Sequence, residues 1–186
     1  MWPRDTATLG QLACRLARGM MFAFAIIVLA GCAAATPQIA TTPGATLSGY
    51  RVLVVAMPIV PKHPDGYSFD VAGTFRDDLK HALSERGYEV VDSANAPSGA
   101  LVVQCEFVTY EEGSAFKRWI MPGWGATQAT VLTTFADQKT GAPLGSLMTS
   151  QAVGAGGLYT IGQYRLILIS VAGEVATAID NKIKGV

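Results

Sequence analysis

The sequence has few of the side chains that metal and redox sites require. It contains two histidines and three cysteines in 186 residues. His63 and His81 have no cysteine or second histidine at ligand spacing. Because a structural zinc ion is usually held by four such side chains, we expect no metal site and no cofactor.

Sequence motifs of catalysis are also missing. There is no G-x-S-x-G motif of a serine hydrolase. The glycine-rich stretches at 123–127 and 154–157 are not followed by the Lys-Ser or Lys-Thr of a phosphate-binding loop. The adjacent carboxylates at 77–78 and 111–112 point to different faces of a helix or strand, so neither pair converges on one substrate. We therefore expect that the protein is not an enzyme.

The amino-terminal residues, in contrast, have the composition of an export signal. Arg4, Arg15 and Arg18 outnumber Asp5 in the first nineteen residues, and the eleven residues 20–30 are uncharged and apolar. As a helix, such a run spans only about 16 Å, which is too short for the roughly 30 Å core of a bilayer. Residues 1–31 are predicted to be a signal peptide that is removed after export.

The site of cleavage is indicated by the sequence LAGC at residues 29–32. This sequence resembles the lipobox of bacterial lipoproteins, in which the cysteine carries a diacylglycerol and usually an amide-linked acyl chain such as palmitate. The resemblance implies lipidation at Cys32. Each buried methylene is worth about 0.8 kcal/mol, so two or three chains anchor a protein almost permanently. Ordinary secretion, with Cys32 incidental, is the alternative.

The residue after the cysteine indicates to which membrane a lipoprotein is sorted. Ala33 stands where aspartate would, by the sorting rule of enteric lipoproteins, retain the protein at the inner membrane. The resemblance therefore implies the periplasmic face of the outer membrane.

The mature chain has almost no net charge. The signal peptide takes away three of 14 basic and one of 14 acidic residues, which leaves 11 against 13, a net charge near −2. No basic excess remains to favour nucleic acid or anionic lipid. We expect a membrane partner through the lipid, and no nucleic acid partner.

Cys105 is then left without a disulfide partner, since Cys14 leaves with the signal peptide and Cys32 takes the lipid. It lies in an alternating stretch that is typical of a half-buried strand. The residues on its face are apolar: Leu101, Val103 and Phe107. Cys105 is therefore predicted to be a buried small apolar side chain rather than a reactive thiol.

The rest of the chain divides in two. Residues 32–49 are uncharged and rich in Ala, Thr, Pro and Gly, which predicts the lipidated cysteine followed by a flexible tether. Residues 50–186 are then predicted to form a single periplasmic domain of ordinary size.

Hydrophobic periodicity predicts the elements of that domain. The predicted strands cover residues 50–58, 88–91, 101–110, 126–136 and 144–153, with a tight hairpin turn at 137–141. One helix begins at Ser68 or Asp70 and ends at Arg86, and a second covers 164–184. On the first helix, the apolar stripe is Val71, Phe75, Leu79 and Leu83, and the side assigned to water is Arg76, Asp77, Asp78 and Lys80. This order predicts an α+β two-layer sandwich, in which two helices pack on one face of a mixed or antiparallel sheet of about five strands.

Three segments in this order resemble a known family. They are LSERGYEVVD, KRWIMPGWGA and VLTTFADQKTGAPL, and a Gly-Gly break and a terminal helix follow them. Together with the lipobox, they are similar to the domain of unknown function 4410 family of proteobacterial lipoproteins, over roughly residues 50–184. The resemblance brings no catalytic residues. More distantly, the pattern is similar to the small α/β domains of periplasmic lipoproteins that activate cell-wall synthases or build secretion channels, and this second resemblance implies a binding or assembly role by analogy.

The segment at 116–124 is the most unusual stretch of the domain. Large apolar residues and two cations lie between glycines: Phe116, Lys117, Arg118, Trp119, Ile120, Met121 and Trp124. Two interpretations stay open. The aromatic side chains either fold back and cover the open face of the sheet, or form an exposed surface for a partner protein or lipid head groups.

From these observations we expect a non-catalytic lipoprotein that binds or assembles with another envelope component, with a partner protein or a second copy of itself. The alternative is a subunit of an oligomeric export or pore assembly, in which residues 111–125 form a hairpin that crosses or touches the membrane. A pore subunit would behave as a large ring in detergent, whereas an enzyme would show a pocket with clustered titratable groups.

Overall fold

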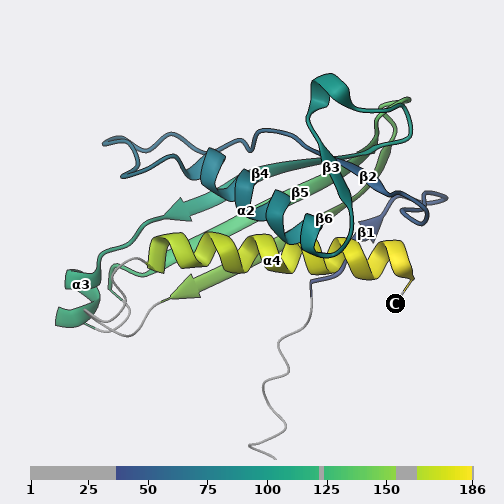
Figure 1. The fold of residues 1–186 in the computed structure, drawn as a ribbon. Coiled ribbons are helices and arrows are strands. Elements are labelled where there is room, and N and C mark those ends of the chain that lie inside the picture. Colours follow the sequence, from purple (N-terminus) through teal and green to yellow (C-terminus); the bar gives the residue numbers. More distant parts are fainter. Residues whose placement is uncertain (1–36, 122–123, 154–162, 186) are drawn as a thin grey trace, which may run out of the picture. The chain divides into compact units, whose positions relative to one another are not determined.

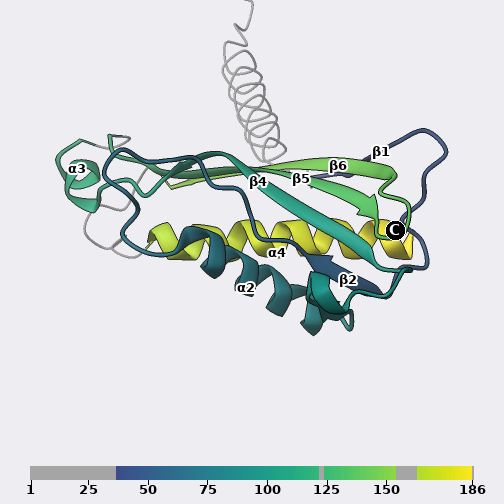
Figure 2. The same cartoon turned by 90° about the horizontal axis from the view of Figure 1, so that it is seen from above.

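The computed structural model describes residues 37–121, 124–153 and 163–185, and these form one mixed sheet with two long helices. The sheet has six strands in the order β1-β6-β5-β4-β2-β3 (Figure 1). Figure 2 shows that the helices α2 and α4 lie on the same side of this sheet. The prediction of an α+β two-layer sandwich is therefore confirmed, with one strand more than expected.

A parallel β-α-β unit begins the sheet. Strand β2 (Val52–Val55) leads through α2 (Val71–Glu85) to β3 (Glu89–Val91), which pairs parallel with β2. Of the two predicted caps, Asp70 begins the helix: its Oδ1 accepts from the Gly73 N–H at 2.9 Å. The helix ends before Gly87, whose φ of 86° is the left-handed conformation that glycine adopts without strain.

A meander of long strands completes most of the sheet. Strands β4 (Leu101–Glu111), β5 (Thr127–Asp137) and β6 (Pro143–Val153) pair antiparallel, and a short 3-10 helix, η1 (Ser93–Asn95), precedes them. The predicted turn after β5 is present: Asp137 Oδ1 accepts from the backbone N–H of Thr140 at 2.8 Å and from its hydroxyl at 2.7 Å. Asp137 Oδ2 also accepts from the Tyr50 hydroxyl at 2.9 Å, which ties this turn to the start of the domain.

The core lies between the sheet and the two helices. Helix α4 (Gln163–Lys184) contributes buried apolar residues along one face, and α2 contributes the predicted stripe. Phe75, fully buried, packs edge-on against Phe107 of β4 with ring centroids 5.0 Å apart. Cys105 is also fully buried, as its place on the apolar face of β4 predicts. None of the helices in the described part of the chain is long and apolar enough to cross a membrane.

From residue 37 onward, the segment that the sequence predicts to be a flexible tether is part of the folded domain. Strand β1 (Ala40–Thr41) pairs with β6, and Ile39 and Leu47 are buried in the core. The prediction of a flexible tether up to residue 49 is therefore wrong for this part, and the domain does not begin at residue 50. The composition does not indicate this packing, because the apolar side chains that reach the core are few in a stretch of small and polar residues: Ile39, Leu47 and the small Ala45.

Candidate functional site

The aromatic segment forms a projection between β4 and β5, which we call the tip (residues 112–126). In Figure 1, its helix α3 (Ala115–Ile120) lies beyond the ends of these two strands. The backbone N–H of Ser114 donates to the Gly125 carbonyl at 2.9 Å, and the Thr127 hydroxyl donates to the Glu112 carbonyl at 2.9 Å. These bonds close the base of the tip.

Two glycines make that closed base possible. Gly113 and Gly125 have φ values of 69° and 71°, in the left-handed region. A Cβ added to Gly113 would lie 2.6 Å from the Gly125 carbonyl oxygen, and one added to Gly125 would lie 2.7 Å from Cβ of Lys117. The two glycines therefore allow the backbone segments at the base of the tip to lie close together.

The tip contains a helix where the sequence predicts a hairpin. Ser114 caps α3, because its Oγ accepts from the Lys117 N–H at 3.3 Å. After the helix, the Met121 N–H donates to the Lys117 carbonyl, and the Trp124 N–H donates to the Met121 carbonyl, each at 3.0 Å. Short-range hydrogen bonds thus hold the backbone around the aromatic residues in place.

The large apolar side chains of the tip are exposed, so they do not cover the sheet. The exposed fractions are 61% for Phe116, 61% for Trp119, 52% for Ile120, 58% for Met121 and 52% for Trp124. The contacts are among neighbours: Phe116 lies against Trp119 with ring centroids 6.2 Å apart, and Lys117 Nζ lies 5.7 Å from the Trp124 ring centroid. The exposure excludes the first of the two interpretations left open above, in which these side chains fold back and cover the open face of the sheet. The side chain of Arg118 and residues 122–123 lie outside the described part.

A polar cavity of about 580 Å³ adjoins the tip. His63, Tyr67, Glu111, Glu112 and Lys117 are among the residues that line it. Burial, and then the nearby charges of Glu111 and Glu112, raise the pKa of Tyr67. The side chains in the cavity bond mainly to backbone: Glu112 Oε1 accepts from the Ser68 N–H at 2.8 Å, and the Tyr67 hydroxyl donates to the Pro61 carbonyl at 2.7 Å.

Metal ligands are not gathered at this cavity or elsewhere in the part of the chain that the structure describes, where no group of three His, Cys, Asp or Glu side chains is close enough to hold an ion. His63 Nδ1 accepts from the Asp65 N–H at 3.3 Å. His81, on the solvent side of α2, lies 3.3 Å from Glu85. This contact joins residues four apart on the same helix.

The conspicuous polar residues at the end of α2 hold the scaffold together. Arg86 Nη2 donates to Thr177 Oγ1 on α4 at 2.8 Å, and the Tyr88 hydroxyl donates to Asp180 Oδ1 at 2.8 Å. Burial and the bond to Asp180 raise the pKa of Tyr88 to about 12. Through Arg86 and Tyr88, the LSERGYEVVD segment therefore joins the end of α2 to α4.

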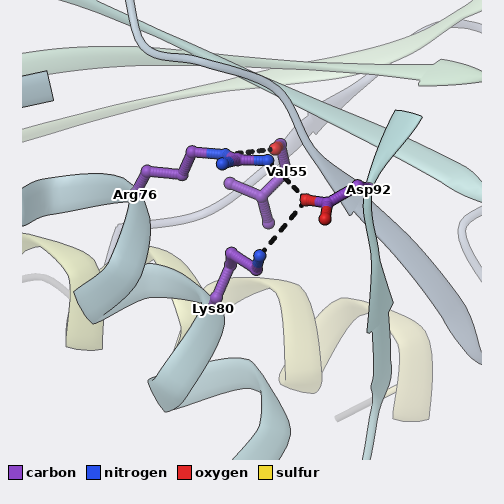
Figure 3. Close-up of polar contacts among 4 residues, drawn as sticks. All are labelled: Val55, Arg76, Lys80 and Asp92. Atoms are coloured by element: carbon purple, nitrogen blue, oxygen red, sulfur yellow. Dashed lines mark hydrogen bonds and ion pairs between the residues drawn. The ribbon is translucent and has the colours of Figure 1, made fainter. Parts of the chain in front are cut away.

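A second polar cluster joins α2 to the parallel strands (Figure 3). Arg76 Nε donates to the Val55 carbonyl at 3.0 Å, and its Nη2 donates to Asp92 Oδ1 at 2.7 Å. Lys80 Nζ donates to the same carboxylate oxygen at 3.3 Å. Hydrogen bonds from Lys80 and Arg76 hold the pKa of Asp92 below its usual value. The assignment of Arg76 and Lys80 to the water side is therefore wrong, because both side chains reach back over the sheet edge.

Asp78 also differs from its expected place in solvent. It is half-buried, and its Oδ2 is buried without a hydrogen-bond partner among the described residues. Burial raises the pKa of Asp78, and the nearby Arg165 on α4 partly offsets this effect. No sequence pattern indicates this environment, because it depends on the approach of α4.

The comparisons with known proteins agree with this fold. The model of the family described as "Domain of unknown function (DUF4410)" matches residues 59–157, which is more than half of the chain. The chain belongs to the domain of unknown function 4410 family. None of the curated proteins matches it.

Solved structures with the same fold are distant in sequence. PelC from Paraburkholderia phytofirmans, solved as a dodecamer, is 13% identical with a TM-score of 0.53, and the match covers 77% of this chain and 97% of that chain. XCC0632 from Xanthomonas campestris, of family model DUF330, is 11% identical with a TM-score of 0.54, covering 80% and 94%. The lipoprotein GNA1162 from Neisseria meningitidis is similar over 68% of this chain and 98% of that chain, at 15% identity, but its TM-score of 0.41 is too low to assign the same fold.

The residues that match the DUF4410 model include α2, the tip and the meander of β4, β5 and β6. Strands β1 and β2 and helix α4 lie outside the match. Two of the three segments that suggest the family, LSERGYEVVD and VLTTFADQKTGAPL, hold the scaffold, and the third, KRWIMPGWGA, forms the tip. Cys32 and residues 1–31 lie outside the described residues.

Proposed function

We propose that this DUF4410 protein is a lipid-anchored, non-catalytic binding protein of the outer membrane's periplasmic face, and that its tip holds an envelope partner protein. The observation that carries the proposal is the tip itself. Five large apolar side chains, each more than half exposed, are grouped on one short segment whose base is closed by hydrogen bonds.

The composition of the tip favours a protein partner. Aromatic side chains supply large, rigid contact areas and are enriched at the centres of protein interfaces. Lys117 beside Trp124 adds a cation that steers an acidic partner. Exposed apolar groups of this kind are rare on proteins that act alone.

The proposal of a non-catalytic role draws on the cavity beside the tip. Catalysis by a nucleophile and a base requires their side chains within hydrogen-bond reach of one another. In the described part of the cavity, the hydrogen bonds of Glu112 and Tyr67 go to backbone groups instead. We therefore assign the cavity to the packing of the tip.

The anchor is tested at Cys32, because the LAGC sequence that motivates it places the lipid on this one thiol. Cys32→Ala should block both lipidation and cleavage at this position. Metabolic labelling with a palmitate analogue measures the first, and the mobility of the chain on a gel measures the second. Labelling of the variant as strong as that of the unaltered chain would refute the anchor.

The tip is tested by replacing Trp119 and Trp124 together with Ala. Because both rings are exposed, the melting temperature should change by only a few degrees, while co-purification of the envelope partner is lost. Leu166→Ala with Ile169→Ala is a matched control, since both side chains are 52% exposed on α4. A double Trp variant that keeps its partner, or that unfolds, would contradict the proposal.

A second candidate is a subunit of an oligomeric export or pore assembly, with the tip against the membrane. The observation that favours it is the likeness to PelC, whose structure is a dodecamer. The size of the particle extracted in detergent separates the two functions. A large ring supports the assembly, and a monomer or dimer supports the binding protein.

A further inference from the structure

Strand β6 lies next to the short edge strand β1, and among the described residues most of the outer side of β6 has no neighbouring strand. Its inner side pairs with β5 from Pro143 to Val153, whereas β1 covers its outer side only at Gly145 and Ser146. Among the described residues, no strand pairs with the outer side of residues 147–153. This is an open sheet edge of seven residues.

The direction of the backbone groups along this edge follows from the pairing with β1. The Thr42 N–H donates to the Leu144 carbonyl at 3.0 Å, and Ala40 pairs with Ser146. Backbone groups in an antiparallel strand alternate between the two sides. Met148, Ser150 and Ala152 therefore direct their N–H and C=O groups outward, where β1 no longer reaches.

The edge lacks the features that usually prevent pairing with another strand. Proteins protect such edges with charged residues, proline or a bulge. Residues 147–153 read LMTSQAV, with no charge and no proline, and their register with β5 is continuous. Two chains can approach here without like-charge repulsion.

The geometry points to a second copy of this chain as the occupant, which we infer to pair antiparallel, β6 against β6, about a two-fold axis at Ser150. The sequence complements itself in this register. Met148 lies opposite Ala152 of the other copy, so a long side chain meets a small one. The two Ser150 side chains, exposed beside Thr130, face each other. The outward groups then form about six backbone hydrogen bonds.

The segment before β1 is the competing occupant within the chain. In an antiparallel ladder, residues before Ala40 would continue along the edge. The described residues 37–39 do not continue it, since β1 begins at Ala40. The inference goes beyond the proposed function, because it concerns a different surface and requires neither the tip nor the lipid.

Disulfide trapping in the full chain tests this pairing. Ser150→Cys places two thiols across the axis, where Cα atoms of paired residues are about 5.5 Å apart, within disulfide range. Mild oxidation of intact cells should convert most of this variant to a dimer on a non-reducing gel. Ser146→Cys is the matched control, because it lies on the same strand but under β1, and it should stay a monomer. Cys105 is buried and adds no background.

The register is tested by two further variants. Ala152→Cys alone should not form a dimer, since its two copies lie about 13 Å apart. Cells that make both Met148→Cys and Ala152→Cys should form the mixed dimer, and adding Ser150→Lys to both chains should abolish it through like-charge repulsion. The Trp119 and Trp124 double variant should cross-link as before, which separates this surface from the tip.

Each alternative gives a result that would overturn the inference. Equal dimer yields at positions 146 and 150 indicate random collision. A monomer at position 150, with slow amide exchange along β6, indicates that residues before β1 cover the edge. A Ser150→Cys adduct of a mass other than the dimer indicates another protein.

Discussion

At the scale of single residues, most of the polar side chains on and near α2 form hydrogen bonds that hold the scaffold together, and Asp78 is the contrasting case. Arg76 joins α2 to β2, Arg86 joins the end of α2 to α4, and Tyr88 joins the residues before β3 to α4. Asp78 is different, because its carboxyl is half-buried and Oδ2 lacks a hydrogen-bond partner in the described structure. The groups around it are the Arg165 guanidinium, the His81 imidazole and the like-charged Asp77.

The raised pKa of Asp78 gives a pH-dependent prediction. A carboxyl whose pKa is higher in the folded state stabilises the fold below its unfolded pKa, and this contribution is lost as the pH rises through the folded value. Asp78→Asn removes the cost of ionisation, so it should raise the melting temperature at pH 7. The gain should shrink as the pH falls toward 4. Thermal melts from pH 4 to pH 7 measure it.

Asp77→Asn is the matched control, because this neighbour is exposed and should change the melting temperature little at any pH. An Asp78→Asn variant that melts below the unaltered protein at pH 7 would show that the carboxylate makes a favourable interaction.

The sequence predicts whether a side chain is buried where hydrophobic periodicity determines its burial. The prediction fails where an element distant in sequence determines it. The alternation of β4 correctly places Cys105 in the core, where burial raises the pKa of its thiol to about 11. The same reasoning assigns Arg76, Asp78 and Lys80 to solvent, because a helical pattern shows which side is apolar but not which strand or helix approaches the other side.

At the scale of elements, both long helices and five of the six strands follow from the sequence to within a few residues. Their apolar patterns are long and their ends carry turn residues. Strand β1 has two residues and no apolar alternation, so its pairing depends on the edge of β6 being available. In the tip, glycines and aromatic residues suggest a loop, whereas Ser114 caps a short helix that only local hydrogen bonds reveal.

Leu47 tests whether residues 37–49 belong to the domain. Its side chain is almost fully buried, so Leu47→Ala should lower the free energy of unfolding by about 2–5 kcal/mol. Urea denaturation measures the loss. Ser48→Ala, at the exposed next residue, should change it by less than about 0.5 kcal/mol. The same stability for both variants would mean that this segment is a tether after all.

At the scale of the domain, the described residues combine a hydrogen-bonded scaffold with an exposed apolar projection, the tip. The DUF4410 match and the distant solved structures establish the scaffold, and at these low identities they describe the fold alone. The sequence locates the tip by composition, because Trp, Phe, Ile and Met in a glycine-flanked segment are conspicuous. It leaves open whether they pack on the sheet, which depends on how the base of the tip is closed.

The most direct test of a partner-binding tip is site-specific photo-crosslinking in intact cells. A photoreactive amino acid at position 119 should give a discrete protein adduct, since this side chain is 61% exposed at the centre of the tip. The same group at position 57, where Met57 is 56% exposed far from the tip in sequence, should give none. Adducts only with lipid at position 119, or the same adducts at both positions, would contradict a protein-binding tip.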